Sequence, residues 1–191
     1  MESSRLEAFS DGVLAIIITI MVIEIKVPEE TTIEALIPMM PKFISYLISF
    51  IFIGTYWNNH HHLFQATEQV NGKVLWANLN LLFWLSLIPF STSWIGENHV
   101  EAIPVAFYGF ILLMSALAFN LLINRIVEHA EDHSLKAIRN KNKIKGIWSM
   151  ILYLLGIILS FWMPWVGIVI YIGVLITWFI PDRKIEYMLN T

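Results

Sequence analysis

Six apolar runs, separated by short polar clusters, fill most of the 191 residues of this chain. We expect one helix in each run, over Leu6–Ile25, Phe43–Leu63, Val74–Ile95, Ile103–Ile123, Ile147–Met163 and Val166–Ile180. A helix needs about 20 apolar residues to cross a bilayer, so six spans use about 120 residues. The sequence therefore predicts an all-α, polytopic membrane protein in which residues 1–191 form a single six-helix domain.

Composition excludes several other classes of protein. Only 14% of the residues are charged and 57% are hydrophobic, whereas a soluble domain carries about 25% charged residues. A net charge of −3 offers no surface for phosphate, so we expect no nucleic-acid partner. The absence of cysteine excludes disulfides and thiolate metal sites. We also expect no removed signal peptide, because no basic segment precedes an apolar run.

The basic residues predict the orientation in the membrane. Alternate connections and both ends carry ten of the twelve basic residues: Arg5, Lys73, Arg125, Lys136, Arg139, Lys141, Lys143, Lys145, Arg183 and Lys184. The opposite side carries Lys26 and Lys42. Because cytoplasmic loops are enriched in Lys and Arg, we expect both termini in the cytoplasm. The outer side carries Glu29, Glu30, Glu34, Glu97 and Glu101. These either form an acidic mouth that attracts cations or are ordinary solvated loop charges.

The first predicted helix does not resemble a simple lipid anchor. Its apolar core is short, so Arg5 and Asp11 come near the membrane, where ionisable groups are costly and face protein or water. These two residues lie about 120° apart on a helix and suit bridges to neighbouring helices, with a structural clamp as the plainer interpretation. Ile16, Thr19, Ile20 and Ile23 share one stripe by spacing. Such a stripe also fits ordinary packing, with the Thr19 hydroxyl bonded one turn back.

Three motifs, in order along the chain, identify a family. The first is Arg5-x-x-x-Phe9-Ser10-Asp11-Gly12-Val13-x-Ala15-Ile16-x-x-Thr19. The second is Trp57-Asn-Asn-His60-His61-His62-Leu63-Phe64, and the third is Asn78-Leu-Asn80-Leu-Leu-Phe-Trp-Leu-Ser86-Leu-Ile-Pro89-Phe90. Together they resemble the transmembrane protein 175 family of potassium channels. The resemblance covers roughly the first half of the chain.

The resemblance implies a homotetrameric potassium channel in a bacterial plasma membrane, with four copies of the first helix lining the pore. Bulky apolar side chains replace a carbonyl-lined filter, and no Thr-Val-Gly-Tyr-Gly segment occurs in the chain. Ile16 takes the narrowest ring, with further apolar rings at Ile20 and Ile23. Thr19 contributes a hydroxyl near which potassium binds transiently. We expect a modest preference for potassium over sodium, and no cofactor beyond the permeant ion.

The resemblance also implies a polar network behind the pore. The Phe9-Ser10-Asp11 motif fixes the first helix against the second and third. The expected partners are Arg5, one of His60, His61 and His62, Asn80, and a tryptophan such as Trp84 or Trp57. All of these side chains can donate hydrogen bonds to the Asp11 carboxylate.

Other functions fit the sequence less well. Three consecutive histidines fan out by about 100° each on a helix, so His60, His61 and His62 do not suit one metal ion. A hydrolase built on Ser10 lacks a Gly-x-Ser-x-Gly elbow, and we expect no enzymatic activity. The alternative that stays open is a proton-conducting or proton-coupled cation transporter that uses Asp11. Such transporters usually show internal repeats and a pair of spans broken by Gly or Pro, and the sequence shows neither an internal repeat nor such a pair.

Overall fold

A computed structural model describes residues 2–67, 69–98, 100–128 and 133–179, with backbone alone for 133–142. The chain is helical: α1 (Ser3–Ile23), η1 (Glu34–Met39), α2 (Met40–Gln65), α3 (Gly72–Ser86), α4 (Ile88–Glu97), α5 (Ala102–Val127), α6 (His133–Ser160) and α7 (Pro164–Phe179). Five segments are long and apolar enough to cross a membrane: Ser3–Ile23, Glu34–Gln65, Gly72–Glu97, Ala102–Val127 and Lys143–Ser160. Pro164–Phe179 is a shorter apolar helix. The all-α membrane architecture is therefore confirmed.

The third expected span, Val74–Ile95, is not one helix. It is broken at Leu87 into α3 and α4, and Pro89 occupies the first turn of α4. Proline has no N–H to continue an α-helical ladder and its ring crowds the preceding turn, so the sequence itself explains the break. A short 3-10 helix, η1, also precedes α2 and was not expected.

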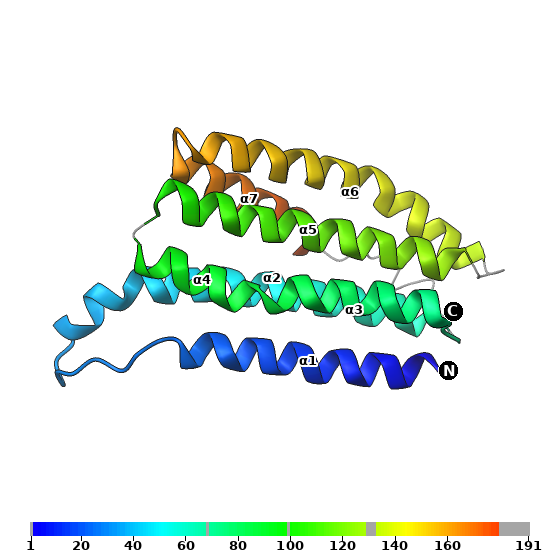
Figure 1. Ribbon diagram of the computed structural model, residues 1–191, viewed down its shortest axis with the longest axis horizontal. Helices are drawn as coiled ribbons and strands as arrows, with labels where there is room; N and C mark the ends of the chain where they lie inside the picture. The colour runs from blue at the N-terminus through cyan, green and yellow to red at the C-terminus, as the bar shows by residue number, and fades with distance from the viewer. Residues whose placement is uncertain (1, 68, 99, 129–132, 180–191) are drawn as a thin grey trace.

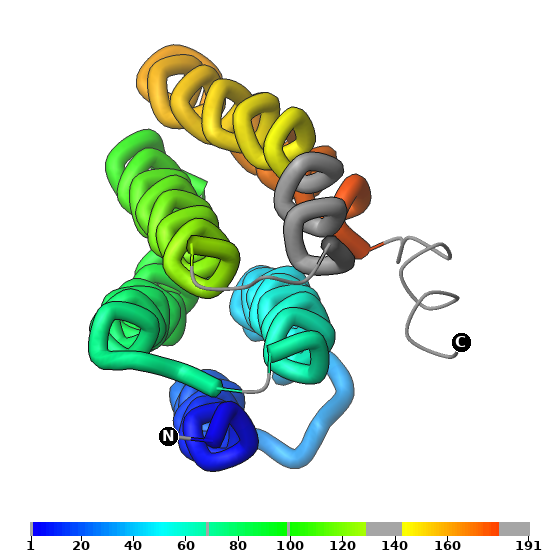
Figure 2. Tube along the Cα trace, turned by 90° about the vertical axis from the view of Figure 1, so that its right-hand side faces the viewer, coloured from blue at the N-terminus to red at the C-terminus, as the bar shows by residue number. Residues whose placement is uncertain are grey.

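The helices lie side by side along one long axis (Figure 1). The end-on view places α1 at one edge, α6 and α7 at the opposite edge, and α2, α3, α4 and α5 between them (Figure 2). Accordingly, α1 packs mainly on α2, α3 and α4, whereas α6 packs on α5 and α7. Three helices on one side of the bundle thus support α1. The side of α1 that faces away from them is left uncovered within one chain.

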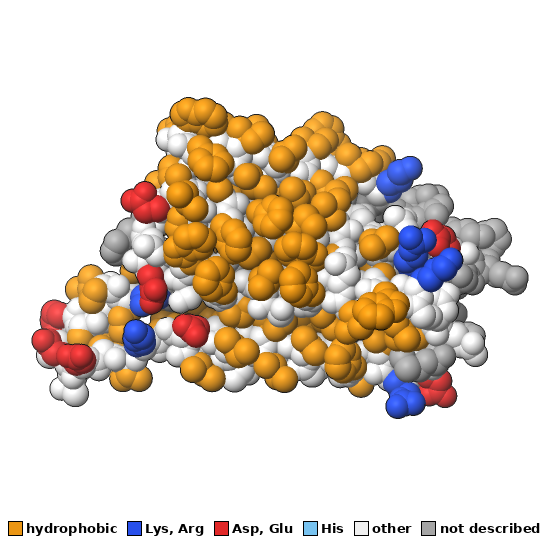
Figure 3. All heavy atoms as spheres, in the orientation of Figure 1, with side chains coloured by type: hydrophobic (Ala, Val, Ile, Leu, Met, Phe, Trp, Pro, Cys, Tyr) orange, Lys and Arg blue, Asp and Glu red, His pale blue; other side chains and the backbone are white. Residues whose placement is uncertain are grey.

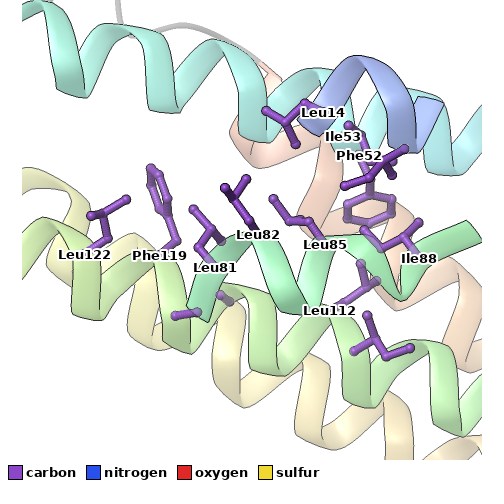
Figure 4. Close-up of a cluster of buried hydrophobic side chains, with 14 of the residues drawn as sticks. Leu14, Phe52, Ile53, Leu81, Leu82, Leu85, Ile88, Leu112, Phe119 and Leu122 are labelled. Atoms are coloured by element: carbon purple, nitrogen blue, oxygen red, sulfur yellow. The ribbon is translucent and has the colours of Figure 1, made fainter. Parts of the chain in front are cut away.

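The core is built from branched and aromatic side chains of several helices. Leu14 of α1, Phe52 and Ile53 of α2, and Leu82 and Leu85 of α3 belong to one buried cluster (Figure 4). Each of these side chains is almost fully buried. Close packing of this kind, rather than burial from water, holds helices together in lipid.

The surface is apolar in its middle and charged at its two ends (Figure 3). Acidic side chains gather near the α1–α2 connection, and basic ones gather mostly at the other end (Figure 3). At the acidic end Lys42 Nζ lies 3.0 Å from Glu97 Oε1 and ties α2 to α4. The distribution is that of a helical bundle embedded in a bilayer.

Candidate pore helix and its anchoring network

The two sides of α1 have opposite surroundings. One side turns into the bundle and is buried: Leu6, Ser10, Leu14, Ile17 and Met21. These positions repeat every three or four residues, as one face of an α-helix requires. The other side contacts no other helix within the described part of the chain. The isoleucine-rich helix α1 is therefore packed against the bundle on one side only.

The uncovered side contains the stripe expected from spacing. Ile16 is 61% exposed, Ile20 43% and Ile23 71%. Thr19 is exposed between them, and its Oγ1 donates to the Ala15 carbonyl oxygen at 2.8 Å. The Thr19 hydroxyl hydrogen is therefore bonded one turn back along α1, as ordinary helix packing predicts. Its oxygen lone pairs remain available on the uncovered side.

A buried relay of hydrogen bonds fixes the other side of α1. Ser10 Oγ donates to the Leu6 carbonyl at 2.9 Å, and Asn78 Nδ2 donates to Ser10 Oγ at 2.9 Å. Asn78 Oδ1 lies 2.8 Å from His60 Nε2. Because the Asn78 oxygen is an acceptor, His60 must carry its proton on Nε2. Ser10, Asn78 and His60 are each at most 1% exposed, so the relay joins α1, α2 and α3 in the interior.

Two carboxylates of α1 bind α2 beside this relay. Trp57 Nε1 donates to Asp11 Oδ1 at 2.9 Å. His61 Nδ1 lies 2.6 Å from Glu7 Oε1, and Gln65 Nε2 lies 2.8 Å from His61 Nε2. The Trp57 and His61 rings are stacked, with centroids 5.9 Å apart. The three anchors at Glu7, Ser10 and Asp11 all belong to the N-terminal half of α1.

Several residues expected in this network lie outside it. Asn80 is exposed, because it is two positions from Asn78 and so about 160° away around α3. Trp84 contacts the Phe83 and Phe110 rings instead of Asp11. Among the described contacts within one chain, neither Asn80 nor Trp84 reaches Asp11, and the tryptophan that does is the other expected one, Trp57.

The remaining expected residues surround the network without joining its hydrogen bonds. Arg5 is exposed, and no ion pair joins it to Asp11 within the described part of the chain. Phe9 is 51% exposed, on the side of α1 away from the core. The His62 ring is tilted against that of His61, and its buried Nδ1 has no partner among the described residues. The three imidazoles thus point to different neighbours.

The sequence interpretation missed Asn78 and Glu7 as partners. Asn78 shares a helical stripe with Val74, Leu81 and Leu85, which the structure buries. Asn80 also has apolar residues at helical spacing, so the sequence alone did not choose between the two asparagines. Glu7 lies one turn before Asp11 on α1, but nothing in the sequence chose among the three histidines as its partner.

Known proteins with similar sequences show to which family this chain belongs. The sequence profile described as endosomal/lysosomal potassium channel TMEM175 matches residues 5–89. A protein named as a potassium channel in Chryseobacterium sp. (strain P1-3) is 52% identical over 190 residues, which cover 100% of this chain and 99% of that relative. The chain belongs to the TMEM175 family. The TMEM175 profile match runs from Arg5 to Pro89 and so covers α1 from its third residue onwards, α2, α3 and all the anchors described above.

Two further TMEM175 relatives show how far the likeness extends. The crystal structure of a lysosomal potassium-selective channel TMEM175 homolog from Chamaesiphon minutus is similar with a TM-score of 0.79 and 30% identity, over 92% of this chain and 95% of that one. The endosomal/lysosomal proton channel TMEM175 of Gallus gallus is 32% identical over 124 residues, which cover 56% of this chain and 25% of that protein. The fold is thus shared with a solved channel along almost its whole length.

Proposed function

We propose that this protein is a homotetrameric potassium channel whose pore is lined by four copies of α1. The observation that carries this function is the asymmetry of α1, which is anchored by polar contacts on one side and presents uncovered isoleucines on the other. One chain leaves these side chains without protein neighbours, and a symmetric ring of chains would place them around a central axis. The names of the bacterial relatives support potassium as the permeant ion.

The pore works by hydrophobic gating. Ile16 forms the narrowest ring, and Ile20 and Ile23 form wider apolar rings beyond it. A tight apolar ring loses its water and blocks ions, whereas a widened ring admits ions that are at least partly hydrated. Potassium gives up water more readily than sodium, so partial dehydration favours potassium. Thr19 oxygens replace only part of the lost hydration shell, which keeps the preference modest.

The channel lies in the plasma membrane of a bacterium with both termini in the cytoplasm. The basic end of the bundle faces the cytoplasm, according to the positive-inside rule. The acidic end, with Glu29, Glu30 and Glu34 near the α1–α2 connection, faces outwards and raises the local concentration of cations.

A catalytic role is disfavoured by the direction of the hydrogen bonds. Ser10 donates its proton to a backbone carbonyl, and an amide separates it from His60. A serine nucleophile needs a histidine within hydrogen-bond reach of its own hydroxyl. The polar network is therefore structural, and its task is to hold α1.

Planar bilayers with potassium on one side and sodium on the other provide the test. Purified protein should give cation currents whose reversal potential is displaced from zero towards the potassium equilibrium potential. A reversal potential set by chloride or by sodium, or the lack of any current with protein shown to be folded, would contradict the proposal.

Proton conduction is a second candidate, favoured by the name of the chicken relative. It is tested by proteoliposomes that contain a pH-sensitive dye and a proton gradient, without potassium. Dissipation of the gradient that is reduced in Asp11→Asn would support proton transfer through Asp11. Proton flux at the rate of protein-free liposomes would exclude it.

A further inference from the structure

Two asparagine side chains at the surface of the bundle have no hydrogen-bond partner among the described residues. Asn80 of α3 is exposed and Asn58 of α2 is half-buried. Asn80 lies seven residues after Lys73, about 10 Å along the helix, and the neighbouring Trp76 and Phe83 are 75% and 55% exposed. Lipid tails offer no hydrogen bonds, so an amide among such apolar side chains is unfavourable without a polar partner. Within one chain Asn80 lacks such a partner.

The bond between His60 and Asn78 shows that the two free amides lie at one height. His60 Nε2 and Asn78 Oδ1 are 2.8 Å apart, so these two residues share a height in the bundle. The helices α2 and α3 run in opposite directions (Figure 1). Asn58 precedes His60 by two residues and Asn80 follows Asn78 by two. Both free amides therefore lie about 3 Å from that bond, towards the acidic end.

The same bond places the two free amides on opposite flanks of the bundle. Residues two positions apart point about 160° away from each other around a helix. Each free asparagine thus points away from the junction of α2 and α3, which lie on opposite sides of the bundle in Figure 2. The exposed surfaces are named the α2 flank (Leu47, Phe50, Gly54 and Asn58) and the α3 flank (Trp76, Leu79, Asn80 and Phe83).

A ring of chains brings these two flanks together. With α1 at the axis, the α2 flank and the α3 flank are the two sides of each chain. In a closed ring one side of each copy meets the other side of the next copy, and rotation about the membrane normal keeps every residue at its height. Asn58 of one copy can therefore meet Asn80 of the next. Each amide has N–H donors and an acceptor oxygen, so each can satisfy the other.

A second match lies about one turn nearer the acidic end. A Cβ at Gly54 of α2 would meet nothing within 4 Å, so the α2 flank has open space there. Phe83 of α3 is 55% exposed. Gly54 lies about 6 Å beyond Asn58, and Phe83 about 4.5 Å beyond Asn80. The ring of one copy thus meets the open space of the next, and small residues of this kind let helices approach closely in membranes.

We propose that the α2 flank of one copy packs against the α3 flank of the next, with a hydrogen-bonded pair between Asn58 and Asn80. The partner of each flank is a second copy of this chain. The pair fixes the height at which neighbouring chains meet, because a slip along the membrane normal separates the amides. In detergent, water reaches the amides of a separated chain, so the pair affects assembly and not the folding of one chain. The ring with α1 at its axis rests on the proposed function.

Crosslinking in membranes tests the contact, because the chain has no cysteine of its own. In Asn58→Cys/Asn80→Cys the two thiols of one chain point to opposite flanks, so a short bifunctional thiol reagent can join only different copies. We expect a ladder of dimers, trimers and tetramers on a denaturing gel. Each single variant should stay monomeric on the gel. Asn58→Cys/Phe90→Cys is the control for height, because Phe90 is 60% exposed but about 15 Å nearer the acidic end, and should give no ladder.

The hydrogen bond is tested by dissociation of the parent and variant assemblies at rising detergent concentration. Asn58→Leu should favour dissociation about threefold at each interface, since hydrogen bonds between helices in membranes are modest. Asn58→Leu/Asn80→Leu should dissociate no more readily than Asn58→Leu, because one substitution already removes the pair. Additive effects of the two substitutions would contradict the pair.

The outcomes separate this interface from the channel function. A ladder from a protein that passes no current would uphold the interface and reject the channel. Cation currents from a double-cysteine protein that gives no ladder, although both thiols react with a monofunctional reagent, would reject the interface and leave the channel. Crosslinked dimers of either single variant would show a two-fold contact and overturn the proposed pairing of flanks.

Discussion

At the scale of single residues, the hydrogen bonds behind α1 run in one direction, from His60 through Asn78 and Ser10 to the backbone of α1. Each side chain donates one hydrogen bond to the next group in this order. Removing one member leaves both neighbours unsatisfied in a buried place, which costs more than the loss of one average hydrogen bond. The relay therefore specifies the rotation of α1 about its axis, and with it which residues are uncovered.

Asn78→Leu tests the relay, because the substitution keeps the volume of the side chain but removes both of its hydrogen bonds. We expect the free energy of unfolding to fall by about 1–3 kcal/mol, measured by thermal or denaturant unfolding in detergent. Asn80→Leu is the matched control on the exposed side of α3 and should change little. Equal stability of the two variants would show that the relay contributes nothing.

Ile16→Asn tests the constriction. A polar ring retains water, so single-channel conductance should rise several-fold and the preference for potassium should decline, as measured from reversal potentials. Folding should be unaffected, because Ile16 is 61% exposed.

Its matched control is the neighbouring Ile17→Asn. Ile17 is only 3% exposed, so the substitution buries an unpaired amide and should lower the yield of folded protein. A parent-like conductance in Ile16→Asn would remove Ile16 from the pore.

At the scale of helices, hydropathy was sufficient to predict the helices, since every apolar run became a helix or a helix pair. Of the six expected spans, five are long and apolar enough to cross a membrane, and Pro164–Phe179 is shorter. The break at Leu87 was missed because Pro89 was counted within a single apolar run, although its lost N–H marks the boundary. The rotation of α3 was missed for another reason. Its apolar residues surround the helix, so the sequence did not distinguish Asn78 from Asn80, and only packing against α1 and α2 separates them.

Helix packing far from α1 depends on close approaches at Gly109, Gly156 and Gly167. A Cβ at Gly109 of α5 would meet the hydroxyl of Tyr171 on α7. Gly109→Ala should therefore destabilise the protein by about 1–3 kcal/mol through overpacking, measured as a lower midpoint of thermal unfolding.

Gly173→Ala is the control, because a Cβ there meets nothing within 4 Å. It should be neutral or slightly stabilising, since alanine is the better helix former. A Gly109→Ala variant as stable as the parent would show that α5 and α7 are not held as described.

At the scale of the whole molecule, the absence of cysteine makes each introduced thiol unique. Ile23→Cys should lose its current when a charged thiol reagent is added, since this position, 71% exposed in one chain, lines the proposed pore. Ile151→Cys on α6 is 49% exposed but lies on the opposite edge of the bundle, and its current should persist. Block at Ile151→Cys but not at Ile23→Cys would contradict the proposed arrangement.

Native mass spectrometry should show four times the mass of one chain, as expected for the proposed homotetramer.

The uneven attachment of α1 has a mechanical consequence. All three polar anchors precede Gly12, whereas Leu14, Ile17 and Met21 hold the rest of the helix by dispersion alone. The helix is thus clamped at its N-terminal end, and its C-terminal end is held less firmly and can move more. Ile16 lies about 8 Å beyond Asp11 and Ile23 about 18 Å beyond it. A tilt about the clamp thus displaces Ile23 more than twice as far as Ile16. In the proposed pore, a small tilt would therefore widen the ring at Ile23 more than the ring at Ile16.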